Sequence, residues 1–181
     1  MKKFINAKIY GYDEASEILV DDGKFIEFGE NLRDCENTID LKGCLVIPPY
    51  VDSHLHLDYY MIGKTDKEEN SSSTLFEAID IWNDFKKGTS KVKLKKRTYG
   101  AEKECLSHGT QYIRAQTDCT DPNLTGIKAA LEVKEELKDK VTIQVVAFPQ
   151  NGMYSYKEGG KTGRNLVEEA LKLGCEVVGG I

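Results

Sequence analysis

The stretch VIPPYVDSHLHLD, residues 46–58, joins an apolar run directly to two histidines that are one residue apart, His54 and His56. Side chains alternate along a β-strand, so both imidazoles are expected on one face, with Leu55 pointing away. Two neutral imidazoles on one face can bind one divalent metal ion. The chain has only three histidines. Placing two of them here strengthens the case for a metal pair, and the alternative, two exposed strand-end histidines without a role, stays open at this point.

The sequence after residue 74 alternates between helical and strand patterns. Helical patterns cover TLFEAIDIWNDFKKG (74–88), SKVKLKKRTYGAEKECLSHG (90–109), DPNLTGIKAALEVKEELKDK (121–140) and RNLVEEALKLG (164–174). Strand patterns cover TQYIRAQTD (110–118), VTIQVVAFPQ (141–150) and CEVVGGI (175–181). Together with a first strand at about 45–53, they predict an α/β fold with four parallel strands. An eight-stranded barrel needs about 250 residues. We therefore expect an incomplete fold, the N-terminal part of a (β/α)8 TIM-type barrel with about four βα units.

Residues 1–45 have a different pattern, of short strands and turns. FINAKIY (4–10) is predicted to be one strand, and SEILVDDGKFIEFG (16–29) a hairpin, because Asp-Gly between apolar runs is a strong turn signal. Pro48 and Pro49 interrupt the next apolar run and should mark where one sheet ends and another begins. We expect two domains: a small β-sandwich segment over 1–45, and the first half of a barrel over 46–181.

Composition excludes several function classes. The formal net charge is −5 and the basic residues are scattered, which argues against nucleic acid or an anionic membrane as a partner. No apolar run approaches the roughly 18 residues of a membrane span. The five cysteines are an odd number without a CxxC spacing, which indicates reduced thiols and a cytoplasmic protein.

These residues carry a resemblance to a known family. VIPPYVDSHLHLD is similar to the first barrel strand of the amidohydrolase superfamily, whose members bind metal through His-x-His at this place. TLFEAIDIW, GTQYIR, LEVKEEL, VTIQVVAFPQNG and LGCEVVGGI follow in the order found in the cytosine deaminase-like branch. VVAFPQ is the element most specific to that branch, and the resemblance covers essentially the whole chain.

The resemblance implies a metal-dependent hydrolytic deaminase that converts cytosine to uracil and ammonia. One divalent metal ion, Fe²⁺ or Zn²⁺, would be held by His54 and His56. Gln150 matches the glutamine that hydrogen-bonds the pyrimidine edge, a task suited to a carboxamide because it offers a donor and an acceptor side by side. Phe148 and Leu75 match apolar positions of the ring pocket, although simple core packing explains both equally well.

Departures from the family pattern leave the substrate open. The other metal ligands and the catalytic acid–base residues of the family lie on later strands, so catalytic residues are expected beyond residue 181. Gln116 and Ser73 replace a histidine and a glycine of the relatives. The alternatives are an amidohydrolase for a related nitrogen heterocycle or triazine amine, and a catalytically dead truncated half-barrel. We expect the 181-residue chain alone to be inactive, and the full-length protein to bind a small-molecule substrate and form homo-oligomers.

Two carboxylates near the predicted strand ends are further candidates. Asp58 follows the histidine pair and could orient an imidazole, since metal-binding histidines usually donate their second N–H to such a group. Asp118 ends the second barrel strand and is a candidate for lining the pocket.

Overall fold

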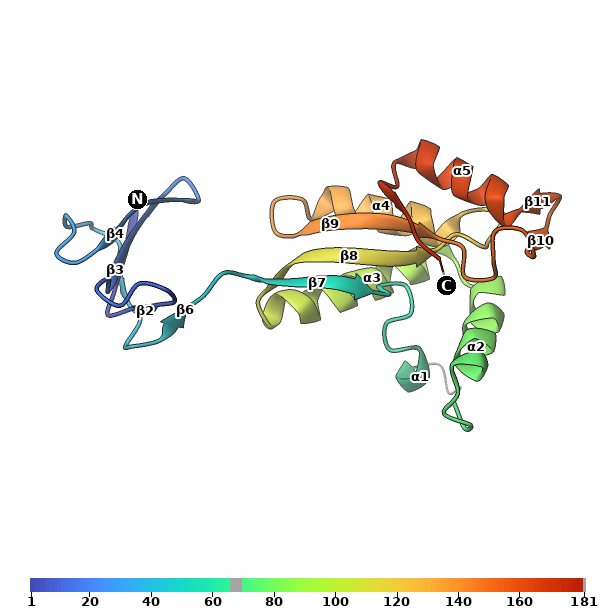
Figure 1. Ribbon diagram of the computed structural model, residues 1–181, viewed down its shortest axis with the longest axis horizontal. Helices are drawn as coiled ribbons and strands as arrows, with labels where there is room; N and C mark the ends of the chain where they lie inside the picture. The colour runs from blue at the N-terminus through green and yellow to red at the C-terminus, as the bar shows by residue number, and fades with distance from the viewer. Residues whose placement is uncertain (66–69, 181) are drawn as a thin grey trace. The chain divides into compact units, whose positions relative to one another are not determined.

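The computed structural model describes residues 1–65 and 70–180 (Figure 1). The chain divides into two compact units, Met1–Pro48 and Pro49–Ile181. The boundary falls between the two adjacent prolines, which have no backbone N–H to continue a sheet. Ile181, the last residue of the fourth predicted strand, lies outside the described residues.

The N-terminal unit consists of short strands. These are β1 (Lys2–Ile5), β2 (Lys8–Ile9), β3 (Glu17–Asp21), β4 (Lys24–Gly29), β5 (Thr38–Asp40) and β6 (Leu45–Val46). Four of them form a sheet in the order β4-β3-β1-β5, and β2 pairs with β6 in parallel. The predicted hairpin is confirmed, because β3 and β4 pair antiparallel around Asp22 and Gly23. Both turn residues have positive φ angles, 47° and 70°, as a tight two-residue hairpin turn requires.

Two predictions for this part of the chain are wrong. FINAKIY is not one strand: Asn6 adopts a φ of 55°, and this left-handed residue separates β1 from β2. The strand expected at about 45–53 is also two elements. Its first residues, Leu45–Val46, pair with β2, whereas the barrel-type strand begins at Tyr50, beyond the prolines.

The second unit alternates strands and helices. Its elements are β7 (Tyr50–Leu55), α1 (Ile62–Thr65), α2 (Leu75–Lys87), α3 (Lys91–Ser107), β8 (Thr110–Asp118), α4 (Thr125–Glu136), β9 (Thr142–Phe148), β10 (Lys157–Glu158), β11 (Lys161–Thr162), α5 (Gly163–Leu173) and β12 (Val177–Val178). The strands β12-β9-β8-β7 form one sheet in that order, and every neighbouring pair is parallel. The prediction of parallel strands joined by helices is therefore confirmed, and Figure 1 shows the arrows of β7, β8 and β9 running in one direction.

The core lies between this sheet and its helices. Helices α3, α4 and α5 contact the strands β8 and β9. Alternate residues of these strands join one buried apolar cluster with the helices: Ile113, Ala115, Ile143, Val145 and Ala147. The residues between them, such as Gln116, Val146 and Phe148, must then lie on the opposite face. In a barrel-type sheet that face is the inner one, where sites are built.

The ends of the helices follow local sequence signals, with one exception. Thr74 caps α2 as predicted, because its hydroxyl accepts the N–H of Glu77 at 3.3 Å. Gly174 ends α5 with a φ of 119°. The helix expected to open at Asp121-Pro122 begins only at Thr125, whose N–H is accepted by the Asp121 carboxylate at 2.6 Å. Within residues 1–65 and 70–180, no helix is both long enough and apolar enough to span a membrane.

Candidate active site at the carboxyl ends of the strands

The parallel register brings the ends of β7, β8 and β9 to one edge of the sheet. Asp118, the last residue of β8, pairs with Phe148, the last residue of β9. On the other side, Leu55 at the end of β7 pairs with Ala115. Residues that leave these three strands therefore meet at one edge, and the candidate site residues His54, His56, Phe148 and Gln150 all lie there or immediately beyond.

His54 and His56 lie side by side, but not through regular strand alternation. Strand β7 ends at Leu55, and its pairing with β8 becomes irregular after Asp52. The Asp52 carboxylate accepts the backbone N–H of His54 at 3.0 Å within this irregular segment. The two imidazole rings nevertheless lie with their centroids 5.3 Å apart at an interplanar angle of 68°. The adjacency required for a shared ligand is thus present, with His54 exposed and His56 half-buried.

His56 has the chemistry of a neutral ligand. Burial, followed by the charge of the neighbouring His54, lowers the pKa of His56, which keeps the ring in the unprotonated form that binds metal. Its Nδ1 atom is buried and has no hydrogen-bond partner among the residues that the structure describes. A buried polar atom without a partner is costly, and a metal ion would satisfy it. The pair therefore fits two ligands of a divalent metal, although the described residues contain no group of three or more His, Cys, Asp or Glu side chains suited to a metal.

Gln150 and Phe148 lie next to the histidine pair. Phe148 is 5% exposed, and its ring meets His56 edge-on, with centroids 5.3 Å apart. Gln150 is 8% exposed, and its side-chain Oε1 accepts a hydrogen bond from the hydroxyl of Tyr59 at 2.8 Å. The Tyr59 ring in turn stacks on His56. The structure therefore brings His54, His56 and Phe148 together through ring contacts, and Tyr59 links Gln150 to His56.

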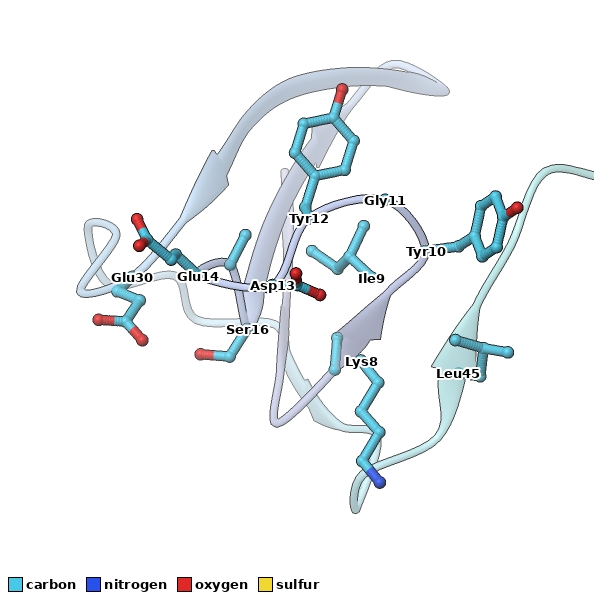
Figure 2. A pocket seen from close by; sticks show the side chains of 12 residues that line it. Lys8, Ile9, Tyr10, Gly11, Tyr12, Asp13, Glu14, Ser16, Glu30 and Leu45 are labelled. Carbon is cyan, nitrogen blue, oxygen red and sulfur yellow. The ribbon is translucent and has the colours of Figure 1, made fainter.

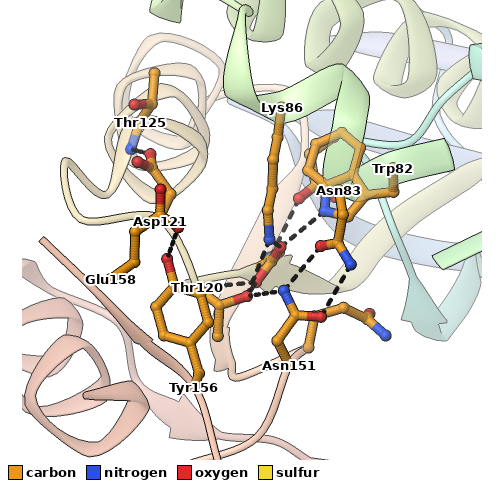
Figure 3. A network of polar contacts seen from close by, with 12 residues as sticks. Trp82, Asn83, Lys86, Thr120, Asp121, Thr125, Asn151, Tyr156 and Glu158 are labelled. Carbon is orange, nitrogen blue, oxygen red and sulfur yellow. Dashed lines mark hydrogen bonds and ion pairs between the residues drawn. The ribbon is translucent and has the colours of Figure 1, made fainter. Parts of the chain in front are cut away.

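Asp118 belongs to a buried network of polar contacts, and Figure 3 shows Trp82, Lys86, Thr120 and Asn151 of this network. Its carboxylate accepts hydrogen bonds from Trp82 Nε1 and Lys86 Nζ, both at 2.7 Å, and from the Thr120 hydroxyl at 2.6 Å. Asn151, just after Gln150, also donates to Thr120 at 3.2 Å. The network ties α2 to the segments that follow β8 and β9, so it fixes the backbone around the candidate site.

Asp58 also differs from its predicted role. It is 2% exposed, and its Oδ2 accepts the backbone N–H of Asp118 at 3.1 Å, while Oδ1 has no partner in the described part of the chain. Burial, followed by the nearby charge of Asp118, raises the pKa of Asp58 to about 8. Asp58 therefore joins β7 to β8, and none of its hydrogen bonds among the described residues goes to an imidazole.

Leu75 is not enclosed with the other candidates. It is the first residue of α2 and is 66% exposed. A separate hollow of about 470 Å³ lies wholly within the N-terminal unit, among Tyr10, Tyr12 and Glu30 (Figure 2). A second, of about 210 Å³, lies beside the Asp118 network and is lined by Lys86, Thr120 and Asp121. Neither hollow contains a predicted site residue.

Tyr59 is the site residue that sequence reasoning missed. It occurs in the segment LDYY, three residues after His56. An aromatic residue close behind a histidine motif is a weak signal in itself. The partner that gives it a role, Gln150, is 91 positions away in the chain, and only the strand register places the two together.

Comparison with known proteins supports the family expected from the motif. The model of the amidohydrolase family matches residues 37–171. N-isopropylammelide isopropyl amidohydrolase of Pseudomonas sp. (strain ADP) is 33% identical over 150 residues, which cover 81% of this chain and 36% of the relative. Adenine deaminase 2 of Oenococcus oeni is 32% identical over 152 residues, 76% of this chain and 26% of the relative.

A solved structure is similar over nearly the whole chain. The 5-methylcytosine deaminase of Klebsiella pneumoniae, determined with 5-fluorocytosine, matches with a TM-score of 0.86 and 35% identity over 98% of this chain and 43% of its own. The chain thus spans between 26% and 43% of the length of these three relatives. The family match covers well over half of the chain, and the fold agrees with part of a TIM-barrel-type enzyme. The chain belongs to the amidohydrolase family.

Proposed function

We propose that this chain is the N-terminal part of a metal-dependent deaminase that hydrolyses cytosine, or a close pyrimidine relative, to the keto form and ammonia. The observation that carries the proposal is the contact chain His56–Tyr59–Gln150 at the strand ends. It joins a candidate metal ligand to a carboxamide suited to a pyrimidine edge. Similarity to the 5-methylcytosine deaminase over 98% of this chain supports the choice of substrate class.

His54 and His56 would hold one Fe²⁺ or Zn²⁺ ion, together with ligands from beyond residue 181. Such a metal lowers the pKa of bound water and so supplies hydroxide at neutral pH. Gln150 would bind the ring edge by hydrogen bonds. Phe148, buried against His56, would support one side of the ring pocket. Leu75 would contribute an apolar surface, which requires a movement of the start of α2 because its side chain is exposed.

The finer features of the fold belong to the same proposal. The sheet β7-β8-β9-β12 would be the first half of a (β/α)8 barrel, and the N-terminal strands part of a small β-sandwich. The open edge strands β7 and β12 favour pairing with further strands, since unpaired edges promote association. We expect the full-length protein to be a cytoplasmic homo-oligomer.

A second candidate is hydrolysis of an alkylamine from a triazine ring. It rests on the Pseudomonas relative, which is 33% identical over 81% of this chain. The same histidine pair would serve it, because both reactions use water to displace an amine from a nitrogen heterocycle. A third possibility, a half-barrel without activity, would keep the fold but bind neither ring at the strand ends.

The test is an NMR titration of the 181-residue chain with cytosine and, separately, with N-isopropylammelide. The proposal predicts that cytosine shifts the resonances of Gln150, Phe148 and Tyr59, and that Gln150→Ala weakens this binding. Gln144→Ala is the matched control, since Gln144 is also a glutamine of the β9 segment, but lies within the strand and accepts a hydrogen bond from Arg114 Nε at 2.7 Å. Shifts at Gln150 with N-isopropylammelide and none with cytosine would favour the second candidate. No shift with either ring would contradict both.

A further inference from the structure

The ring of Tyr59 is held between two aromatic partners. On one side it stacks on His56, with centroids 4.6 Å apart and an interplanar angle of 22°. On the other it packs against Trp82 at 4.2 Å and 31°. Trp82 is itself fixed, because it is 2% exposed and donates its Nε1 to the buried Asp118 carboxylate at 2.7 Å. The Tyr59 ring therefore has little freedom to rotate away from its position.

The backbone that carries Tyr59 is equally constrained. The two preceding residues, Leu57 and Asp58, are 1% and 2% exposed. Leu57 packs in the main apolar cluster, and Asp58 accepts the N–H of Asp118. With backbone and ring both fixed, the direction of the Tyr59 hydroxyl is set by the fold, and it ends 2.8 Å from Gln150 Oε1.

This bond decides which part of the Gln150 carboxamide remains for a ligand. A carboxamide has one oxygen acceptor and one NH₂ group with two donors. Tyr59 occupies the oxygen. Among the residues that the structure describes, Nε2 of Gln150 has no hydrogen-bond partner. This nitrogen is not one of the buried unpaired side-chain atoms, so it remains accessible to solvent. The NH₂ group of Gln150 is therefore the part of the carboxamide that remains available to a ligand.

We propose that Tyr59 is a positioning residue that orients Gln150 as a hydrogen-bond donor towards the ligand. The site then selects heterocycles that present a ring carbonyl oxygen as the acceptor at this edge. A ring that presents an N–H there meets a second donor and is rejected, because a buried donor is left unpaired. The ligand preference rests on the proposed function; the orientation of Gln150 does not.

The first experiment needs no ligand. The side-chain NH₂ resonances of Gln150 are followed by NMR in the wild-type chain and in Tyr59→Phe, which keeps the ring and removes the hydroxyl. The two NH₂ protons should be well separated and rigid in the wild type, and should move towards the values of a free glutamine in the variant. Tyr60→Phe is the matched control, since the neighbouring hydroxyl bonds instead to Glu104 at 3.4 Å. An unchanged Gln150 side chain in Tyr59→Phe would overturn the proposal.

The second experiment compares cytosine with 4-aminopyrimidine, which lacks the ring carbonyl. The wild-type chain should bind cytosine more tightly by roughly 3- to 10-fold, the worth of one hydrogen bond. The Tyr59→Phe variant should lose this preference for cytosine. When Gln150 is already replaced by alanine, adding Tyr59→Phe should alter the affinity for cytosine by less than about twofold. A preference that survives in Tyr59→Phe would contradict the role of Tyr59. Failure of the wild type to bind either ring, with the NH₂ result as expected, would refute the proposed function alone and leave the orientation of Gln150 established.

Discussion

The hydroxyl of Tyr59 donates to Gln150 Oε1 at 2.8 Å across 91 positions of sequence. The contact exists because β7 and β9 both run parallel to β8, so the segments that leave them emerge at one edge of the sheet. This edge also holds His54 and His56. The register of the backbone hydrogen bonds between these strands thus brings residues from distant parts of the chain together in one site.

The histidine pair should bind zinc. His54→Ala or His56→Ala is expected to weaken Zn²⁺ binding to the chain by at least about tenfold, because a single imidazole cannot chelate. Isothermal titration calorimetry measures the change directly. His108→Ala is the control, since His108 caps α3 and lies 3.6 Å from Glu104 rather than near the pair. Equal zinc affinity in all three variants would show that the pair is not the ligand. In the full-length protein, His54→Ala should likewise abolish metal retention.

The Lys86–Asp118 ion pair should be important for stability. The Asp118 side chain is buried, at 1% exposed, and the Lys86 side chain is largely covered, at 11% exposed, with Nζ and Oδ2 2.7 Å apart. Lys86→Met leaves a buried carboxylate with fewer partners, so we expect a loss of about 3 kcal/mol in the free energy of unfolding. Urea denaturation provides the measurement. Lys87→Met removes an exposed pair with Asp84 and should cost less than about 1 kcal/mol. Equal losses in the two variants would refute the assignment.

Glu102 should make the protein less stable as the pH rises. It is 0% exposed on α3, neither carboxylate oxygen has a partner within residues 1–65 and 70–180, and burial raises its pKa to about 7. Because the folded state holds this proton more tightly than the unfolded state, stability is lost between pH 4.5 and about 7. Glu102→Gln should therefore be more stable than the wild type by about 3 kcal/mol above pH 7.5, and similar to it near pH 4.5.

Urea denaturation at several pH values tests the Glu102 prediction. Glu104→Gln, at an exposed position of the same helix, controls for the loss of one negative charge. A gain from Glu102→Gln that is the same at pH 4.5 and pH 8 would contradict an origin in the buried proton.

Gly179 should not tolerate a side chain. A Cβ at this position would lie 2.8 Å from Gln116 Oε1 and 2.9 Å from side-chain atoms of both Phe148 and Val146. Gly179→Ala should cost about 1–3 kcal/mol of stability through overpacking and should shift the NMR resonances of Phe148. Gly180→Ala meets no atom within 4 Å and is the control. A neutral Gly179→Ala would mean that the chain end after β12 yields easily.

Much of the fold could be predicted from local signals. The strand that the sequence predicts at 110–118 is β8, Thr110–Asp118, because Gly109 and a polar turn bound a long strand pattern on both sides. The hairpin at Asp22-Gly23 and the ends of α2 and α5 have equally local causes. The strand before the histidines was misjudged because the pairing partner of Leu45–Val46 is β2, which no local pattern indicates.

The site could be predicted only in part. His54 and His56 carry their own spacing, and the resemblance supplied Gln150 and Phe148. That these four residues act on a pyrimidine is a prediction. The role of Tyr59 could not be predicted, since it depends on the register of two strand pairs. The hydrogen bonds from Lys86 and Trp82 to Asp118 likewise depend on where α2 packs. The helical pattern of α2 does not specify that position.

Ammonia release from cytosine by a chimera tests whether this chain forms the N-terminal part of a deaminase. In it, this chain replaces the matching 43% of the Klebsiella 5-methylcytosine deaminase, which supplies the remaining strands. We expect that the 181-residue chain alone releases no ammonia above the buffer rate with iron or zinc added. We also expect that the chimera does release ammonia, and that His54→Ala abolishes the reaction. A folded, metal-loaded chimera that releases isopropylamine from N-isopropylammelide but no ammonia from cytosine would contradict the account.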